Sequence, residues 1–423
     1  MTNSRAVLLL LIANAISGVS QGITMLAVPW YFTGILHEEG LFGGIYLTVT
    51  FISLFWGIYS GTLIDRYDRK LIFLGMNTAG FVVLSGVSLY GMLHEQMSWW
   101  AAALPFAATA FIYNIHFPNL YAYAQEITPK EDYAKVTSLL EIQGQISFTL
   151  AGGIAAVLLH GMSGQDEIFA FPFLPSVSLP SIEIWHIFAL DALTYAAAFF
   201  IIYRIRSLAV VQKNIDTAPL RQRLVTGFIY LRQHPLIFRF GVFSLMLFLT
   251  ILVFGTQISP MFVKLHLRAG GNVFAISDMA FSFGALLAGV IVGKAVKGTQ
   301  TVPRIIQMHL LAGCMYLVML LTFYPLIFFI ANFIIGFCNA GVRIMRVTHL
   351  FQHVPNHVIG RTGSVFFVIN VLCRLILIGL FSFSFFHKPR MVLIPVALLA
   401  LICFVAALAL WRDHRYEVQH NLG

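Results

Sequence analysis

Charged side chains are scarce in this sequence: Asp, Glu, Lys and Arg supply only 10% of its 423 residues, whereas soluble domains carry about a quarter. A soluble enzyme of this length is thereby excluded, because polar side chains would have to cover each of its outer faces. What is abundant is apolar: 59% of the residues are hydrophobic. They form runs of about 20 residues, the length that crosses the hydrocarbon core of a bilayer as a helix.

Cysteine is rare too, and no nucleotide-binding signature is present. The four cysteines, Cys314, Cys338, Cys373 and Cys403, lie inside apolar runs without any Cys-x-x-Cys spacing, which argues against a metal or redox centre. No Gly-x-x-x-x-Gly-Lys-Ser/Thr motif exists to hold ATP phosphates. We therefore predict no enzyme activity, no metal, no cofactor and no use of ATP, so that an ion or substrate gradient must supply the energy for any transport.

The apolar runs predict an all-α membrane protein with twelve transmembrane helices in two pseudo-symmetric sets of six. The first set is predicted at residues 6–36, 42–64, 70–93, 99–125, 136–162 and 183–203. The second set is predicted at residues 235–263, 273–296, 302–322, 324–346, 359–386 and 391–411. A basic segment with an amphipathic stretch at 220–231 separates them. This predicts an N-terminal half at 1–206, a cytoplasmic connector at 207–234 and a C-terminal half at 235–423.

The net charge of +9 does not indicate nucleic-acid binding, because the basic residues stand singly or in small clusters between apolar runs. When successive loops are assigned to alternate sides of a membrane, nearly all of the basic residues fall on one side. The exceptions are Lys264, Arg268, Lys388, Arg390 and the intramembrane Arg374. By the positive-inside rule, both termini are predicted to lie in the cytoplasm.

Residues 61–70 read Gly-Thr-Leu-Ile-Asp-Arg-Tyr-Asp-Arg-Lys, which resembles the signature of the major facilitator superfamily between its second and third helices. The resemblance implies the twelve-helix fold of that family and a conformational latch in which the aspartate binds the start of the eleventh helix. There, exposed amides and an arginine would attract a carboxylate. The predicted latch residues are Gly61, Asp65, Arg66, Arg69, Gly360 and Arg361.

The sequence also departs from the family pattern. Asp68 stands where the signature usually has glycine, and the related stretch at 289–294 in the second half lacks the acid. An Arg-x-x-x-x-Gly motif, frequent on the fourth helix of proton-coupled members, is absent from 99–125, which weakens the case for proton coupling. Other stretches, at 118–140, 152–153 and 190–195, resemble the macrolide-efflux and siderophore-exporter branch.

Ionisable residues inside the membrane are costly and are therefore functional candidates. Arg374 is predicted either to bind an anionic group of the substrate or to form a structural ion pair. Asp278, and after it Asp191, are the predicted proton carriers, the alternative for each being a hydrogen-bonded residue of helix packing. His349, His353 and His357 have helical spacing, but Pro355 interrupts them, which disfavours a metal site.

Polar residues on four helices form the predicted substrate cavity, because the resemblance implies that helices one, four, seven and ten line it. On the first helix, Asn14, Ser17 and Gln21 share one face. Interhelical hydrogen bonding is the competing explanation for such residues. The predicted cavity residues are Asn14, Gln21, Asn114, His116, Gln257, Asn339 and Arg374.

The sequence thus predicts a secondary active transporter that exports a small amphiphilic organic molecule, siderophore-like or drug-like, by alternating access and proton antiport. The predicted location is the cytoplasmic (inner) membrane, and the predicted state is a monomer. An importer or a lysophospholipid flippase of the same fold is the alternative, and a non-transporting membrane receptor is a further one. The receptor would carry a soluble signalling domain, for which no segment is seen.

Overall fold

The computed structural model describes residues 3–128, 133–160, 181–205, 220–295 and 301–420, and every regular element within these ranges is helical. Among these described residues, eleven helices are long and apolar enough to cross a membrane. This confirms the predicted all-helical membrane protein. Helices suit the bilayer core because they satisfy their own backbone hydrogen bonds, where no water is present to do so.

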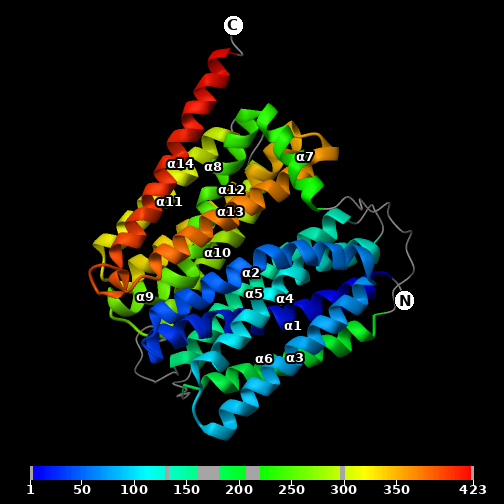
Figure 1. The fold of residues 1–423 in the computed structure, drawn as a ribbon, viewed down its shortest axis with the longest axis vertical. Helices are drawn as coiled ribbons and strands as arrows, with labels where there is room; N and C mark the ends of the chain where they lie inside the picture. The colour runs from blue at the N-terminus through cyan, green and yellow to red at the C-terminus, as the bar shows by residue number, and fades with distance from the viewer. Residues whose placement is uncertain (1–2, 129–132, 161–180, 206–219, 296–300, 421–423) are drawn as a thin grey trace. The chain divides into compact units, whose positions relative to one another are not determined.

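The N-terminal part of the chain forms the helices expected from its apolar runs (Figure 1). The bounds are α1 Asn3–Trp30, α2 Glu39–Arg66, α3 Arg69–His94, α4 Trp99–Glu126, α5 Tyr133–His160 and α6 Ile184–Tyr203. The helix at α4 is present at the predicted place but is not among the eleven apolar spans. Its Asn, His, Tyr, Trp and Pro residues lower its mean hydropathy below that of the eleven spans.

The C-terminal part continues the pattern. Its helices are α7 Leu220–Gln233, α8 Pro235–Val253, α9 Ser259–Leu265, α10 Gly271–Ala295, α11 Thr301–Leu321, α12 Pro325–His353, α13 Asn356–Phe381 and α14 Leu393–His420. The predicted amphipathic stretch of the connector is α7. Helix α12 runs past the predicted end at Arg346 and stops at His353, because Pro355 cannot continue it. Helix α13 ends at Phe381, before the predicted residue 386.

One π-helical turn ends the first membrane helix, and another lies between α8 and α9. Residues Tyr31–Ile35 form one such turn directly after α1, and Phe254–Ile258 form the other between α8 and α9. Single π turns inside α-helices occur mostly at functional sites. The second turn contains Gln257, a predicted cavity residue.

The chain divides into two compact units. Unit 1 comprises Met1–Glu38, Phe51–Ile215 and Ala269–Met279, and unit 2 comprises Glu39–Thr50, Asp216–Arg268 and Ala280–Gly423. Helix α2 and helix α10 each contribute residues to both units. The predicted boundaries of the halves and the connector remain predictions.

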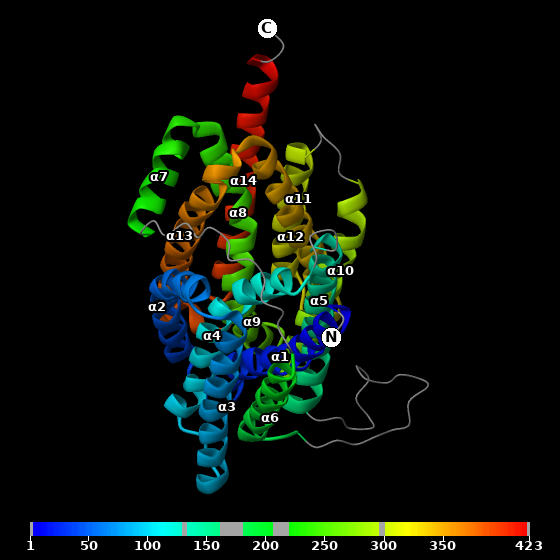
Figure 2. The same cartoon turned by 90° about the vertical axis from the view of Figure 1, so that its right-hand side faces the viewer.

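In unit 1, α1 packs against α5, α6 and α4, and α3 packs against α6 and α4 (Figures 1 and 2). Glycine permits the closest approaches. A Cβ atom on Gly22 of α1 would lie 2.6 Å from the Cβ of Ala151, and one on Gly152 of α5 would lie 2.8 Å from the backbone nitrogen of Met279. No larger residue fits at either position unless a neighbour moves.

In unit 2, α11 packs against α14 and α12, and α8 packs against α14, α13 and α12 (Figure 1). The first residues of α2 belong to this unit: Glu39 forms an ion pair with Lys264 at 3.2 Å, and the Tyr46 hydroxyl donates to the Leu252 carbonyl at 3.2 Å. Helix α7 packs on α13, where the backbone of Gly227 lies against the carbonyl of Arg361.

Candidate functional site

A chain of hydrogen bonds joins three helices in the interior of unit 1. His116 of α4 donates from Nε2 to Asn14 Oδ1 of α1 at 2.7 Å, and Asn14 Nδ2 donates to Gln143 Oε1 of α5. Gln143 in turn donates from Nε2 to the Ser147 hydroxyl at 2.8 Å. His116 is 8% exposed and Asn14 is 7% exposed. Two predicted cavity residues are thus brought together in one buried polar cluster.

The His116 ring is held from the other side by an aromatic residue. Phe73 of α3 packs edge-on against it, with 5.4 Å between ring centroids. Phe73 is almost fully buried. An imidazole fixed by one hydrogen bond and one aromatic contact has few orientations left, so its second nitrogen is presented in a defined direction.

A second buried cluster surrounds Asp191 of α6, which is 1% exposed. The Thr24 hydroxyl of α1 donates to Asp191 Oδ2 at 2.6 Å. The Thr194 hydroxyl donates to the Asp191 backbone carbonyl at 2.8 Å and lies 3.4 Å from Oδ1. No cation is paired with this carboxylate among the described residues. A buried carboxylate that relies on hydroxyl donors alone is costly to keep ionised, and for that reason it is a candidate for proton binding.

The two predicted proton carriers lie near one tyrosine. Asp278 of α10 is half-buried and belongs to unit 1, and both its carboxyl group and that of Asp191 are close enough to act electrostatically on the Tyr113 hydroxyl of α4. Gln21 of α1 is 2% exposed, and its Nε2 has no hydrogen-bond partner among the described residues.

The participants that sequence reasoning missed include Thr24, Gln143 and Ser147. Thr24 extends the series Asn14, Ser17 and Gln21 by one more helical step, so its position on the same face could have been found. Gln143 and Ser147 are four residues apart on α5 and share a face. Nothing in their spacing, however, indicated which helix that face would meet.

The remaining predicted cavity residues lie in unit 2, with one exception. Gln257 is 1% exposed and donates from Nε2 to the Ile378 carbonyl at 3.2 Å and to the Ser382 hydroxyl at 3.1 Å, so it ties the π turn to the end of α13. Arg374 of α13 has a buried Nε without a hydrogen-bond partner among the described residues. Asn339 is half-buried on α12. The exception is Asn114 of α4, in unit 1, which donates to the Ser53 hydroxyl at 3.3 Å.

Of the predicted latch residues, Gly61, Asp65, Arg66 and Gly360 lie within helices but outside the residues whose side chains are described. Arg69 donates to the Ala122 carbonyl at 2.8 Å and to Glu126 at 3.2 Å, which joins the start of α3 to the end of α4. Burial raises the pKa of Glu126, and Arg69 limits that rise. Arg361 is half-buried at the start of α13. The latch remains a prediction.

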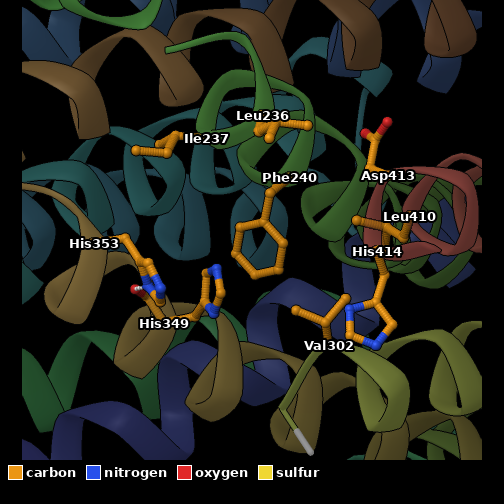
Figure 3. Close-up of a pocket in the computed structure, with 9 residues that line it drawn as sticks. All are labelled: Leu236, Ile237, Phe240, Val302, His349, His353, Leu410, Asp413 and His414. Carbon is orange, nitrogen blue, oxygen red and sulfur yellow. Dashed lines mark hydrogen bonds between the residues drawn. The ribbon is translucent and has the colours of Figure 1, made fainter. Parts of the chain in front are cut away.

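A small pocket lies at one end of unit 2 between α8, α11, α12 and α14 (Figure 3). His349 and His353 stack at 4.1 Å, and His349 also packs against Phe240 at 4.1 Å. The pocket volume of about 40 Å³ leaves room for a few water molecules only. No group of three metal-ligating side chains is found among the described residues, and the side chain of His357 lies outside them.

The helical architecture and the buried polar interior define a multi-pass membrane protein, and comparison with known proteins gives its family. Residues 10–377 match the Major Facilitator Superfamily. The chain belongs to this superfamily, whose members are transporters rather than enzymes. It is therefore an integral multi-pass membrane protein, and its family moves small molecules, often with protons.

Solved structures with this fold are similar over nearly the whole chain. The nucleoside transporter NupG aligns with a TM-score of 0.71 and 13% identity, covering 96% of this chain and 98% of that one. A D-xylose-proton symporter aligns with a TM-score of 0.69 and 13% identity, covering 97% and 98%. At such low identity the likeness shows the fold alone, and it confirms the predicted fold of the superfamily.

Sequence relatives match a smaller part of the chain at a higher identity, and they carry a functional name. Macrolide efflux protein A of Streptococcus pyogenes is 25% identical over 293 residues, 66% of this chain and 64% of that protein. The protein of the same name from Enterococcus faecalis is 25% identical over 240 residues, 55% of this chain and 66% of that protein. The chain thus spans slightly less than two thirds of the length of these relatives, and the predicted resemblance to macrolide-efflux proteins is confirmed at this distance.

Proposed function

We propose that this transporter exports a small amphiphilic organic molecule, macrolide-like in size and polarity, across the cytoplasmic membrane in exchange for protons. The observation that carries the proposal is the buried polar interior of unit 1. There the Asp191 carboxylate accepts a hydrogen bond from the Thr24 hydroxyl at 2.6 Å, and among the described residues no cationic side chain is paired with it. The similarity to macrolide efflux proteins supports the direction and the cargo class.

In this mechanism Asp191 holds the transported proton, and the hydrogen-bonded side chains of His116, Asn14 and Gln143 contact the cargo. Protonation removes a charge that costs about 2.5–3.5 kcal/mol at the bilayer centre, so the protonated state lowers the barrier to rearrangement of the surrounding helices. Loss of the proton restores a carboxylate that needs its hydroxyl donors. Alternating access couples these two states to the two orientations of the protein.

The cargo meets neutral hydrogen-bonding groups in this cluster. His116, Asn14 and Gln143 offer donors and acceptors without a fixed charge, which suits the hydroxyl and carbonyl groups of a polyoxygenated amphiphile. Arg374 of unit 2, whose Nε has no partner among the described residues, is the group to which an anionic cargo would bind. An importer or flippase of anionic lysolipids would depend on that residue.

Inside-out and right-side-out membrane vesicles distinguish these functions. The cargo panel comprises a radiolabelled macrolide, a siderophore and a lysophospholipid, each offered with an imposed pH gradient. We expect the macrolide to accumulate in inside-out vesicles that are acidic inside, and we expect Asp191→Asn to abolish the dependence on pH. Accumulation only in right-side-out vesicles would contradict export. Movement of the lysophospholipid alone, lost in Arg374→Gln, would establish the flippase.

We further propose that Asp65 acts as the conformational latch with Gly360 and Arg361, as the family signature at 61–70 suggests. Asp65→Asn removes the charge and little volume, so membrane insertion is expected to be unchanged while transport falls strongly. The measurement is the rate of macrolide efflux, normalised to the amount of protein in the membrane. Normal transport by the well-expressed variant would overturn the latch.

A further inference from the structure

Helix α7, which precedes the first membrane helix of unit 2, is held on that unit by one of its faces. A Cβ atom on Gly227 would lie 2.4 Å from the carbonyl oxygen of Arg361, so the two backbones are in direct contact. One helical turn further, the buried Leu231 packs in a cluster with Val365 and Phe366 of α13. Figure 1 shows α7 beside the beginning of α13. These contacts determine which face of α7 points away from unit 2.

The opposite face of α7, called its outer face below, is apolar at the centre and basic at the end. Val225, Phe228 and Ile229 are 49–54% exposed, and together with Arg232 they follow the i, i+3, i+4, i+7 spacing of one helix face. The whole helix carries three arginines and no acidic residue. Arg232 is exposed and has no ion-pair partner among the described residues. The outer face is therefore complementary to a partner that is both apolar and anionic.

The depth of α7 follows from the two membrane helices to which it is connected. The apolar span of α8 begins at Pro235, two residues after α7 ends at Gln233, and that of α13 begins at Arg361, which Gly227 contacts. Two points of α7, about 9 Å apart along the helix, thus lie at the level where membrane spans begin. A helix held in this way lies in the interfacial region of the bilayer. From the distribution of basic residues, this side is predicted to be cytoplasmic, where the membrane surface is negatively charged.

We infer that the outer face of α7 binds anionic phospholipid of the bilayer, with its apolar residues among the acyl chains and Arg232 on the lipid phosphate. An arginine suits this position because its long side chain extends from an apolar level to the headgroups, and its guanidinium group forms paired hydrogen bonds with phosphate. Lipid is favoured over a soluble partner because lipid already surrounds the protein at this depth. The inference goes beyond the proposed function. Since Gly227 contacts Arg361, the bound lipid would also hold the first turn of α13 at the membrane surface.

Photolabelling of the full-length protein in lipid nanodiscs tests this surface. The probes are a phosphatidylglycerol and a phosphatidylcholine that carry the same diazirine near the top of one acyl chain, and mass spectrometry locates the labelled residues. The variant Arg232→Gln removes the charge of the outer face. Arg390→Gln is the matched control, because Arg390 is also exposed, also has no ion-pair partner among the described residues, and lies between α13 and α14 on the side predicted to be the outer one. Arg232→Lys keeps the charge.

The expected result is labelling of residues 225–232 that is stronger with phosphatidylglycerol than with phosphatidylcholine. Arg232→Gln should weaken the labelling of α7 by phosphatidylglycerol about fivefold, the factor expected for one basic residue near an anionic membrane surface. Arg232→Lys should keep most of it, and Arg390→Gln should leave it unchanged. A high salt concentration should reduce the preference for phosphatidylglycerol. Ile229→Ser should weaken labelling by both probes, because both depend on the apolar contact.

Equal labelling of α7 by the two probes would overturn the inference, since the headgroup would then not be recognised. Absence of label from α7, while the ends of other membrane helices are labelled, would also overturn it, because a protein surface would then cover the outer face. Labelling requires neither a gradient nor transport. Failure of the vesicle experiment would therefore refute the proposed export and leave the lipid contact standing, whereas unselective labelling with normal export would refute the lipid contact alone.

Discussion

The hydroxyl of Thr24 offers the sharpest test of the Asp191 site, because Thr24→Val removes it with little change in volume. The carboxylate then loses its donor at 2.6 Å. The Thr194 hydroxyl lies 3.4 Å from its other oxygen but donates to the Asp191 backbone carbonyl at 2.8 Å. A hydrogen bond to a charged group contributes about 1.5–3 kcal/mol. Because the ionised carboxylate is one state of the proposed cycle, its population should fall by about 10- to 150-fold.

The assay compares two modes of transport for the same variant. Proton-driven efflux in inside-out vesicles passes through both protonation states, so its rate should fall strongly in Thr24→Val. Exchange of labelled for unlabelled cargo at a constant acidic pH does not require proton release, so it should be largely preserved. The control Thr24→Ser keeps the donor and should transport nearly as well as the wild type. If the Thr24→Val variant exports the cargo at the wild-type rate, the proposal that Thr24 stabilises the ionised form of Asp191 in the transport cycle is refuted.

Three further predictions concern positions whose role follows from single contacts. Asp68 caps α3 by accepting a hydrogen bond from the Leu71 amide at 3.0 Å, so Asp68→Ala should lower the free energy of unfolding by about 0.5–2 kcal/mol, whereas Asp68→Asn should keep most of it. Thermal unfolding in detergent measures the difference, and equal melting temperatures would contradict the capping role of Asp68. Gly152→Leu should impair folding or transport because α10 leaves no space for a side chain there, whereas a Cβ built on Gly144 of the same helix meets no atom within 4 Å, so Gly144→Leu should be tolerated. The yield of monodisperse protein distinguishes the two variants. Glu39→Gln should lower the free energy of unfolding by more than the roughly 0–1 kcal/mol of a surface ion pair, since neither Glu39 nor Lys264 is well exposed. Adding Lys264→Met should restore part of the lost stability, and an additive loss in the double variant would mean that the pair is not coupled.

The membrane helices could be predicted from the sequence because apolar length is a direct requirement of the bilayer. Predicted and observed bounds agree within a few residues at most ends, and Pro355 explains where α12 stops. Helix α4 is the instructive case. Its polar and aromatic residues reduce its apolar character, yet those same residues, Asn114 and His116, form interhelical contacts in unit 1.

The buried clusters could be predicted only in part. The face of α1 that carries Asn14 and Gln21 follows from helical periodicity, and Asp191 was a candidate because of its charge. Which side chain meets which is set by packing between helices far apart in the sequence: Thr24 and Asp191 are separated by 167 positions. Glycine contacts such as Gly22 against Ala151 fix these distances, and no local pattern encodes them.

Asp68 shows how a departure from a family motif can have a local cause. The residue replaces a glycine of the signature, which the sequence alone presented only as a deviation. In the structure its carboxylate accepts from the first turn of α3, so the substitution stabilises a helix start. A carboxylate there also interacts favourably with the positive end of the helix dipole.

Proton movement triggered by the cargo tests the central proposal most directly. Inside-out vesicles are first acidified by respiration, and the internal pH is followed with a fluorescent weak base while the macrolide is added. Proton-coupled export through the unit 1 interior predicts that the macrolide raises the internal pH in the wild type and has no effect in Asp191→Asn. A macrolide that accumulates without any change in internal pH, or an equal pH change in the variant, would contradict it.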